Sequence, residues 1–298
     1  MEIVVSGSTG LIGAALVPAL TAAGHRVVRL VRKSPRPGTS DVFWDPAKAY
    51  VDTAKLEDKD AVVHLAGESI AERWTPQKKI RIHESRGRGT HLLCEALRQL
   101  QHPPKVLVNG SAIGYYGDRG DELLREESAP GSGFLADVCR EWEASTEPAS
   151  RRGIRVVHLR TGIVLSTKGG ALAKMLLPFR LGAGGKIGSG KQYMSWIAID
   201  DHTAAIQHLI ENGAMQGPVN AVAPNPVTNL EFTKTLGRVL SRPTFAPLPA
   251  FVVRLAFGQM GEELLLASQR VEPARLRSSG FSFRFPDLET ALRQVLGL

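Results

Sequence analysis

Apolar residues in the first half of the chain alternate between short β-branched runs and longer stretches with helical spacing. The short runs predict buried strands at residues 2–6, 26–31, 60–65, 105–109 and 154–159. The longer stretches predict helices at residues 11–23, 77–100 and 134–151. Because strands that alternate with helices form parallel sheets, the pattern predicts an α/β fold with a doubly wound parallel sheet.

The pattern changes near Leu165, where glycine- and proline-rich loops are expected over residues 166–192. We expect residues 1–164 to form a cofactor-binding domain whose sheet is completed by later segments, and residues 165–298 to form a smaller C-terminal α/β lobe over the substrate. Asp200 and Asp201 are expected to cap a helix that follows a strand at residues 193–199. Further helices are expected at residues 229–240, 251–257, 262–268 and 288–296.

A glycine-rich loop joins the first predicted strand to the first predicted helix. Its residues are Gly7, Ser8, Thr9, Gly10, Leu11, Ile12 and Gly13. In a unit of this kind one glycine makes the tight turn, one lets a diphosphate approach the backbone, and one lets the helix pack closely on the strand. The amide groups and the positive end of the helix then face the anion. Since a second strand follows at the right distance, the loop predicts a dinucleotide site rather than a simple turn.

The end of the second strand indicates which dinucleotide the site binds. NAD sites place an acidic residue there to hold the ribose hydroxyls, whereas a 2′-phosphate is bound by Arg or Lys. Here the strand is followed by Arg32 and Lys33, with no acid nearby. The sequence therefore favours NADP as the cofactor, and the alternative is that these two residues form a solvated basic turn.

A second glycine-rich segment, residues 185–192 (GKIGSGKQ), nearly matches a nucleoside-triphosphate-binding loop. The Ser or Thr that would bind magnesium is replaced by Gln192, and no buried strand precedes the segment. An NTPase is therefore not expected.

Composition and charge narrow the range of partners. Of 298 residues, 43% are hydrophobic and 22% charged, which is typical of a globular protein rather than a disordered one. The net charge is +8, but the basic residues are scattered and lack interleaved aromatic residues, so we expect anionic small molecules and not nucleic acid as ligands. With no leader and no apolar run of membrane-spanning length, we expect a cytoplasmic protein without a membrane partner. The sequence leaves open whether the protein forms a homodimer.

The two cysteines, Cys94 and Cys139, have a spacing that fits neither a zinc site nor a disulfide framework. We therefore expect reduced thiols and no metal site.

Several short motifs occur together along the chain. They are Gly7-x-x-Gly10-x-x-Gly13, His64-Leu-Ala-Gly-Glu68, Glu84-Ser-Arg86, Tyr115-Tyr116, Trp142-Glu143, Arg160-Thr-Gly162, Leu177-Pro-Phe-Arg180, Ile187-Gly-Ser-Gly190 and Trp196-Ile197. Their conjunction resembles the extended and atypical short-chain dehydrogenases/reductases, most nearly the epimerase-family branch of the YfcH type with a C-terminal domain of unknown function. The resemblance covers essentially the whole chain, and it implies a Rossmann-like fold with an NADP site.

The resemblance also assigns residues to that site. It implies a diphosphate on Gly7 to Gly13, a 2′-phosphate at Arg32 and Lys33, an adenine or ribose edge near Leu65, Ala66 and Gly67, and cofactor contacts at Arg86 and Arg160. Either of the last two arginines could instead form an ion pair or lie at the surface.

Enzymes of this superfamily commonly use a Ser, a Tyr and a Lys, in which the Tyr exchanges a proton with the substrate oxygen and the Lys lowers its pKa. When the predicted helix at residues 134–151 is aligned through Glu143, the Tyr falls on Leu135 and the Lys on Cys139. The serine falls on Ala112, next to Ser111. The usual mechanism is therefore unavailable to this chain.

Other groups could replace the missing ones. Tyr115 and Tyr116 follow a predicted strand end and could handle the proton, and Ser111 could hold a carbonyl, although packing alone could also explain the tyrosines. Glu143 could act as a base, but a helical Glu more often pairs with an Arg. We expect either an NADP(H)-dependent oxidoreductase or epimerase, or a non-catalytic NADP(H)-binding protein.

The substrate side differs from that of nucleotide-sugar epimerases. The Arg that those enzymes use to grip a sugar-nucleotide diphosphate is absent from residues 192–196 (QYMSW). A pocket beside Tyr193, Met194 and Trp196 would be apolar. A small carbonyl compound is therefore at least as good a candidate substrate as a sugar nucleotide.

Overall fold

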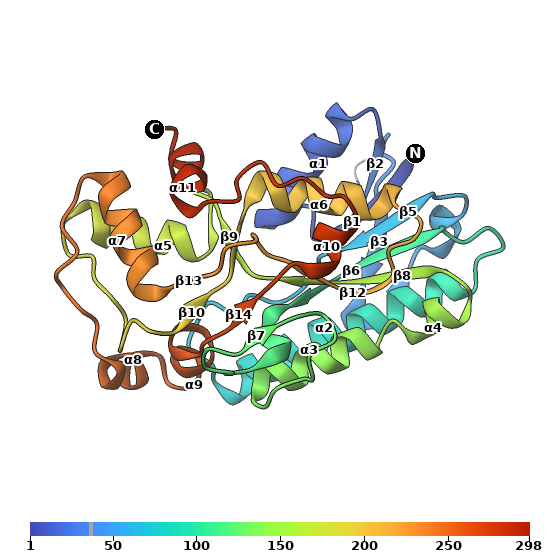
Figure 1. Cartoon of the computed structure of the whole chain (residues 1–298). Coiled ribbons are helices and arrows are strands. Elements are labelled where there is room, and N and C mark those ends of the chain that lie inside the picture. The colour runs from blue at the N-terminus through green and yellow to red at the C-terminus, as the bar shows by residue number, and fades with distance from the viewer. Residues whose placement is uncertain (36–37) are drawn as a thin grey trace.

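The computed structural model describes residues 1–35 and 38–298 (Figure 1). Within these residues, eight strands form one sheet in the order β12-β8-β6-β5-β1-β2-β3-β4. Neighbouring strands are parallel except for the antiparallel pair of β3 and β4 at one edge. The strands are β1 (Glu2–Ser6), β2 (Arg26–Val31), β3 (Val42–Asp45), β4 (Tyr50–Val51), β5 (Ala61–His64), β6 (Val106–Ala112), β8 (Arg155–Thr161) and β12 (Gly217–Ala221). The predicted α/β fold is confirmed.

Helices cover both faces of this sheet (Figure 1). On one face lie α1 (Leu11–Ala22) and α6 (Ile199–Glu211), and on the other lie α2 (Pro76–Arg98), α3 (Phe134–Ala144) and α4 (Glu147–Arg151). In β1, Ile3 and Val5 belong to the core cluster that includes α1 and α6, whereas Val4 belongs to the cluster that includes α2 and α4. Because both faces of the strand are buried, its sequence is continuously apolar rather than alternating.

Short elements lie between these larger ones along the chain. They are the 3₁₀ helices η1 (Pro46–Lys48), η2 (Thr53–Leu56) and η3 (Ile113–Tyr116), and the two-residue strand β7 (Leu123–Leu124). Of these, η3 directly follows the carboxyl end of β6.

The second half of the chain forms a lobe beside the sheet, but it is not independent of the sheet. Its elements are β9 (Ile163–Leu165), α5 (Gly170–Arg180), β10 (Tyr193–Met194), β11 (Trp196–Ala198), β13 (Val227–Thr228), α7 (Asn229–Leu240), α8 (Ala250–Phe257), α9 (Gln259–Gly261), the π-helical turn η4 (Glu262–Leu266), β14 (Arg270–Val271), α10 (Ala274–Ser278) and α11 (Leu288–Leu296). The same half also supplies β12 to the main sheet and α6 to its face.

Three expectations about single elements are corrected. The helix expected at residues 134–151 is two helices, α3 and α4, with Pro148 in the first turn of the second. The strand expected at residues 193–199 divides into β10, which pairs with β13, and β11, which pairs with β9. The segment expected to consist of loops contains α5, whose proline, Pro178, lies inside the helix.

Asp200 and Asp201 do lie in the first turn of α6, but neither caps it. The carboxylate of Asp201 instead accepts hydrogen bonds from the backbone N–H groups of Arg284 and Phe285, at 2.9 and 3.0 Å. The side chain thus fastens the C-terminal segment to the sheet-covering helix.

Within residues 1–35 and 38–298, none of the helices combines the length and apolarity that crossing a membrane requires. In the same residues no three His, Cys, Asp or Glu side chains gather closely enough to hold a metal ion. Cys94 and Cys139 are both buried and unpaired.

Candidate cofactor-binding and active site

The loop between β1 and α1 is shaped by its glycines. Gly7 has φ +65°, and a Cβ there would lie 2.8 Å from the carbonyl carbon of Leu65 in the segment after β5. A Cβ on Gly13 would lie 2.2 Å from the Gly7 carbonyl oxygen, so only glycine lets the first turn of α1 reach the loop. No acidic residue and no side-chain cap occupy the start of α1. The loop therefore fits an anion such as a dinucleotide diphosphate at this helix terminus.

Two polar residues to which the sequence analysis gave no role hold this loop against β5. The buried Ser6 hydroxyl lies 2.7 Å from His64 Nδ1 and accepts from the backbone N–H groups of Leu65 and Ala66 at 3.0 and 3.2 Å. Burial lowers the pKa of His64 to about 4, so the imidazole is neutral at pH 7. Both are polar residues at the carboxyl ends of apolar strands, which is the signal that could have revealed them.

Arg32 and Lys33 directly follow β2, one strand away from the glycine loop. Both are exposed, and neither forms an ion pair or hydrogen bond with any residue in the described part of the chain. Arg29, by contrast, makes a bidentate pair with Asp41 at 2.9 and 2.6 Å. Among the described residues, the two predicted to bind a 2′-phosphate are thus cations without a partner at this strand end.

Glu143 on α3 ties the carboxyl ends of β6 and β8 together. Its carboxylate accepts from the Ser111 hydroxyl at 2.7 Å and makes a bidentate pair with Arg160 Nε and Nη2 at 2.8 and 2.9 Å. Arg160 Nη1 also donates to the Tyr116 hydroxyl at 3.0 Å and to the Glu126 carbonyl at 3.1 Å. Four of the five guanidinium N–H groups are therefore engaged inside the protein. Glu143 therefore pairs with an arginine, as the alternative to its role as a base predicted. The Ser111 hydroxyl donates its hydrogen to Glu143, so this hydrogen is not directed toward a substrate carbonyl.

The two adjacent tyrosines of η3 have different surroundings. Tyr116 is fully buried, its hydroxyl donates to Asn220 Oδ1 at 2.7 Å, and burial raises its pKa to about 12. This geometry favours the packing alternative for Tyr116. Tyr115 is half-buried, and the Arg160 guanidinium lies 3.5 Å from its ring centre. The Tyr115 hydroxyl has no partner among the described residues and is not among the enclosed polar atoms.

The helix positions that would carry the Tyr and Lys of related enzymes are closed. Leu135 is 8% exposed and Cys139 3%, and both pack against Gly114 of η3. Burial raises the pKa of the Cys139 thiol to about 11, so it is neutral at pH 7. Neither position offers a hydroxyl group or a charge.

The structure does place Gly67 and Arg86 together, beside the segment that follows β5. A Cβ on Gly67 would lie 3.2 Å from the Arg86 guanidinium carbon. Arg86 Nη1 donates to the Glu68 carbonyl at 3.0 Å, and its guanidinium lies 4.9 Å from the centre of the Trp142 ring.

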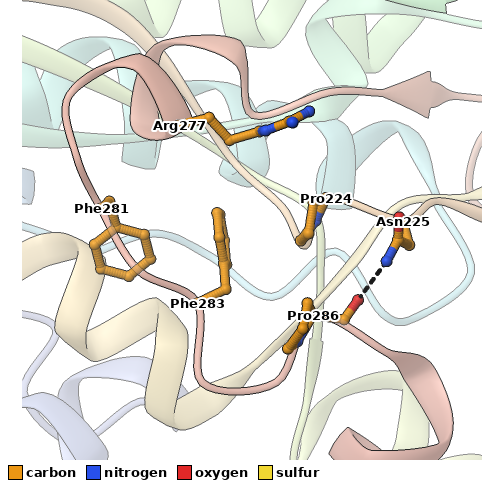
Figure 2. A pocket seen from close by; sticks show the side chains of 6 residues that line it. All are labelled: Pro224, Asn225, Arg277, Phe281, Phe283 and Pro286. Atoms are coloured by element: carbon orange, nitrogen blue, oxygen red, sulfur yellow. Dashed lines mark hydrogen bonds between the residues drawn. The ribbon is translucent and has the colours of Figure 1, made fainter.

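The expected apolar pocket beside Tyr193, Met194 and Trp196 is corrected. Trp196 is fully buried and Met194 is 9% exposed, and both belong to the core of the lobe. A pocket of about 390 Å³ lies elsewhere (Figure 2); it is lined by Pro224, Asn225, Arg277, Phe281, Phe283 and Pro286. None of the residues predicted to bind cofactor lines that pocket, so it is separate from the candidate site.

Sheet, glycine loop and strand-end residues together define an NAD(P)-binding protein of the epimerase and short-chain dehydrogenase/reductase class. The model of the NAD dependent epimerase/dehydratase family matches residues 3–221, and that of the domain of unknown function DUF1731 matches residues 248–295. The chain therefore belongs to the NAD dependent epimerase/dehydratase family.

Relatives match nearly the whole chain. The epimerase family protein MT2273 of Mycobacterium tuberculosis is 43% identical over 291 residues, which cover 97% of this chain and 96% of that protein. The crystal structure of human epimerase family protein SDR39U1 (isoform 2) with NADPH has a TM-score of 0.91 at 38% identity and covers 100% of this chain and 99% of that one. A nucleoside-diphosphate sugar epimerase structure from Corynebacterium glutamicum has a TM-score of 0.82 at 41% identity, covering 100% of this chain and 58% of that one.

Proposed function

We propose that this protein is an NADP(H)-dependent oxidoreductase or epimerase that acts on a small carbonyl or sugar-type substrate. The glycine loop fits the dinucleotide diphosphate, and Arg32 and Lys33 suit the 2′-phosphate of NADP. The likeness to human SDR39U1, whose structure contains NADPH, supports the same cofactor. When bound, the nicotinamide would supply or accept the hydride.

The proton that accompanies the hydride is assigned to Tyr115. In the reductive direction its hydroxyl gives a proton to the substrate oxygen as the carbonyl carbon gains the hydride, which yields an alcohol; in the oxidative direction the phenolate takes the proton back. Arg160 and Glu143 hold the phenol ring in place through the stack of Arg160 on Tyr115 and the bidentate ion pair.

One observation carries this assignment. Among the hydroxyl groups predicted to act on substrate, only that of Tyr115 has no partner within the described chain, and it is not fully enclosed. Gly131 fixes the turn that presents it, because its N–H donates to the Tyr115 carbonyl at 2.9 Å and a Cβ there would lie 2.0 Å from the Tyr116 carbonyl oxygen.

Turnover by a Tyr115→Phe variant tests the proposal. With NADPH and a panel of aldehydes, ketones and sugar nucleotides, we expect this variant to lose about 10²- to 10⁴-fold in kcat, the usual contribution of a general acid, and to keep its NADPH affinity. Tyr50→Phe is the matched control, since Tyr50 is 49% exposed on the edge strand β4. Full turnover by Tyr115→Phe would reject Tyr115 as the proton donor.

A second candidate function is favoured by the burial of Leu135 and Cys139. These residues occupy the positions of the catalytic Tyr and Lys of related enzymes and cannot perform their roles. Under this alternative the chain binds NADP(H) without turning over a substrate. Tight NADPH binding by the wild type, with no oxidation of the cofactor across the whole panel, would favour this alternative over the oxidoreductase.

A further inference from the structure

The pocket of about 390 Å³ in Figure 2 is formed by segments that lie far apart in the sequence. Two of its lining residues follow the carboxyl end of β12, one lies on α10, and three belong to the segment between α10 and α11; in that order they are Pro224, Asn225, Arg277, Phe281, Phe283 and Pro286. The last four lie within the segment matched by DUF1731. Since none of the residues predicted to bind cofactor or substrate lines this pocket, the proposed function does not account for it.

Rings make up most of the wall of this pocket. Phe281 and Phe283 meet edge to face, with their ring centres 4.9 Å apart. Figure 2 shows these two rings on one side of the pocket and Pro224 on the other. Both phenylalanines and both prolines are half-buried, so part of each ring stays open to water. A flat apolar group in the pocket would cover this ring surface, which is favourable.

Arg277 brings a positive charge to this apolar pocket. Figure 2 shows its side chain extending from α10 along one edge of the pocket. Within residues 1–35 and 38–298 that side chain forms no ion pair and no hydrogen bond, and none of the lining residues is acidic. The nearby Asp287 carboxylate accepts from Asn225 Nδ2 at 3.3 Å. An exposed arginine needs no partner, so the charge alone indicates nothing, but beside the rings it supplies the anion-binding part of a site.

Contacts with the rest of the protein hold the walls of the pocket in place. Asn225 Nδ2 donates to the Pro286 carbonyl at 3.1 Å, which joins the segment after β12 to the C-terminal segment (Figure 2). The Asp201 carboxylate on α6 holds the two backbone N–H groups that precede Pro286. His208, on the same helix, packs on Phe281 with ring centres 5.5 Å apart. A pocket whose walls are already fixed loses little conformational entropy when a ligand binds.

We propose that this pocket is a second ligand site, which binds a small molecule with a planar aromatic ring and a carboxylate or phosphate group. The ring lies against Phe281 and Phe283, and the anionic group accepts hydrogen bonds from the Arg277 guanidinium, whose planar fork matches both kinds of anion. The volume of about 390 Å³ is within the range of small-molecule sites. The site goes beyond the proposed function and does not depend on it.

Binding of simple aromatic anions tests the site. In NMR titrations with excess NADPH present to fill the cofactor site, we expect 2-naphthoate or 2-naphthyl phosphate to bind the wild type with a Kd of about 1 mM or tighter, the affinity that a ligand of this size reaches at ordinary efficiency. The tighter of the two identifies the anion that the site prefers. The neutral 2-naphthylmethanol and the non-aromatic cyclohexanecarboxylate should each bind at least about fivefold more weakly, because one lacks the charge and the other the ring.

Variants then locate the binding. We expect Arg277→Met to weaken binding of the preferred anion by about fivefold or more, the effect of losing a charge-assisted hydrogen bond, and to leave 2-naphthylmethanol within about twofold. Phe283→Leu should weaken both ligands by about threefold, because both use the ring. Arg284→Met is the matched control, since Arg284 is exposed in the same segment and does not line the pocket.

The other results overturn the inference. If neither naphthyl anion binds at about 10 mM, or if the neutral alcohol binds as tightly as the anions, the pocket is not an anion site. Unchanged affinity in Arg277→Met, or an equal loss in Arg284→Met, would place the binding elsewhere. Thermal unfolding without ligand shows whether Arg277→Met is folded, and Arg277→Gln takes its place if it is not. A wild-type protein that binds no NADPH would contradict the proposed function and leave this test unaffected.

Discussion

Three arginines that the sequence analysis assigns to the cofactor site, Arg32, Arg86 and Arg160, have different interaction partners in the structure. Arg160 has four partnered N–H groups in a buried pair with Glu143, Arg86 is anchored by two backbone carbonyls near the Glu68 carboxylate, and Arg32 is exposed with no partner in the described chain. Nothing local in the sequence distinguishes them, because the partners come from distant segments: Glu143 is on α3 and Trp142 stacks on Arg86 from the same helix. The positions of partners decide which arginine is free to bind a ligand.

For Arg32 the expected consequence is cofactor selectivity. Arg32→Ala should weaken NADPH binding by about tenfold or more and change NADH binding by about twofold at most, because only NADPH carries the phosphate that the guanidinium would bind. Isothermal titration calorimetry with both cofactors measures this. Arg26→Ala serves as the control, since Arg26 is exposed at the opposite end of the same strand. Equal losses for the two cofactors would remove the argument for a 2′-phosphate site.

Among helices and strands, the local hydrophobic pattern was sufficient to predict an element whose own residues determine its conformation. The predicted strand at residues 26–31 coincides with β2, and the predicted helix at residues 288–296 coincides with α11, whose core-facing residues recur with helical spacing. Failures occurred where a distant partner or an unusual composition decides. Flanking glycines and Pro178 hid α5, and β12 (GPVNA) carries little β propensity, so only its pairing with β8 makes it a strand.

The site was predictable to a similar degree. The glycine loop was found because its spacing is local, and the lost Tyr and Lys were recognised by alignment of α3. The Ser6–His64 anchor and the contacts of Glu126 with β12 and α10 join residues 58 and more positions apart, which no local pattern reveals. Tertiary contacts alone separated Tyr115 from Tyr116.

The start of α3 depends on the C-terminal region in a way that can be measured. The helix begins after Gly133 without a capping side chain of its own, and the Glu263 carboxylate accepts from the backbone N–H groups of Phe134 and Leu135 at 3.1 and 2.8 Å. A carboxylate here satisfies two N–H groups and opposes the positive end of the helix dipole. The turn η4 that carries Glu263 thus acts as a cap supplied from residues 248–295, the segment matched by DUF1731.

We expect Glu263→Gln to lower the free energy of unfolding by about 1–2 kcal/mol, since the amide keeps one acceptor oxygen but presents a donor to the second N–H. Urea denaturation measures the change. Glu262→Gln is the control, because Glu262 is exposed and pairs only with Arg254 at 3.0 Å in the described chain, an interaction expected to contribute under about 1 kcal/mol. If both variants lose the same stability, the capping role is rejected.

For the whole molecule, the two halves of the chain share one interior. The core cluster on the α1 side of the sheet includes Ile3 from the first strand and Leu276 from α10. A buried polar chain crosses the same boundary: Tyr116 donates to Asn220, whose backbone N–H donates to Glu126 at 3.1 Å, and that carboxylate also accepts from Arg275 N at 3.2 Å. We therefore expect the lobe and the sheet to unfold together rather than as separate domains.

That shared interior makes stability depend on pH through its buried histidines. Burial lowers the pKa of His64 and of His202 from 6.5 to about 4, so the unfolded chain binds protons first as the pH falls. The stability that each neutral imidazole contributes is present above pH 6.5 and is lost between pH 6.5 and 4. The loss is about 1.4 kcal/mol per pH unit, or roughly 3 kcal/mol for each histidine over this range. Burial raises the pKa of Glu126 and of Asp201. These two carboxyl groups oppose the trend, because the folded protein binds their protons at a higher pH than the unfolded chain does.

His202→Gln isolates one of these contributions. The variant should be less stable than wild type at pH 7.5, because the bond of His202 Nε2 to the Thr161 hydroxyl at 3.0 Å is disturbed, but it should lose less stability on acidification. The gap between the two proteins in free energy of unfolding should therefore narrow by roughly 2–3 kcal/mol from pH 7.5 to pH 4.5, as urea denaturation at each pH would measure. His91→Gln is the control, since His91 is exposed on α2 and its loss should leave the wild-type slope unchanged. Parallel curves for wild type and His202→Gln would mean that His202 is not held neutral in the folded protein, because a group that titrates alike in both states contributes nothing to the pH dependence of folding.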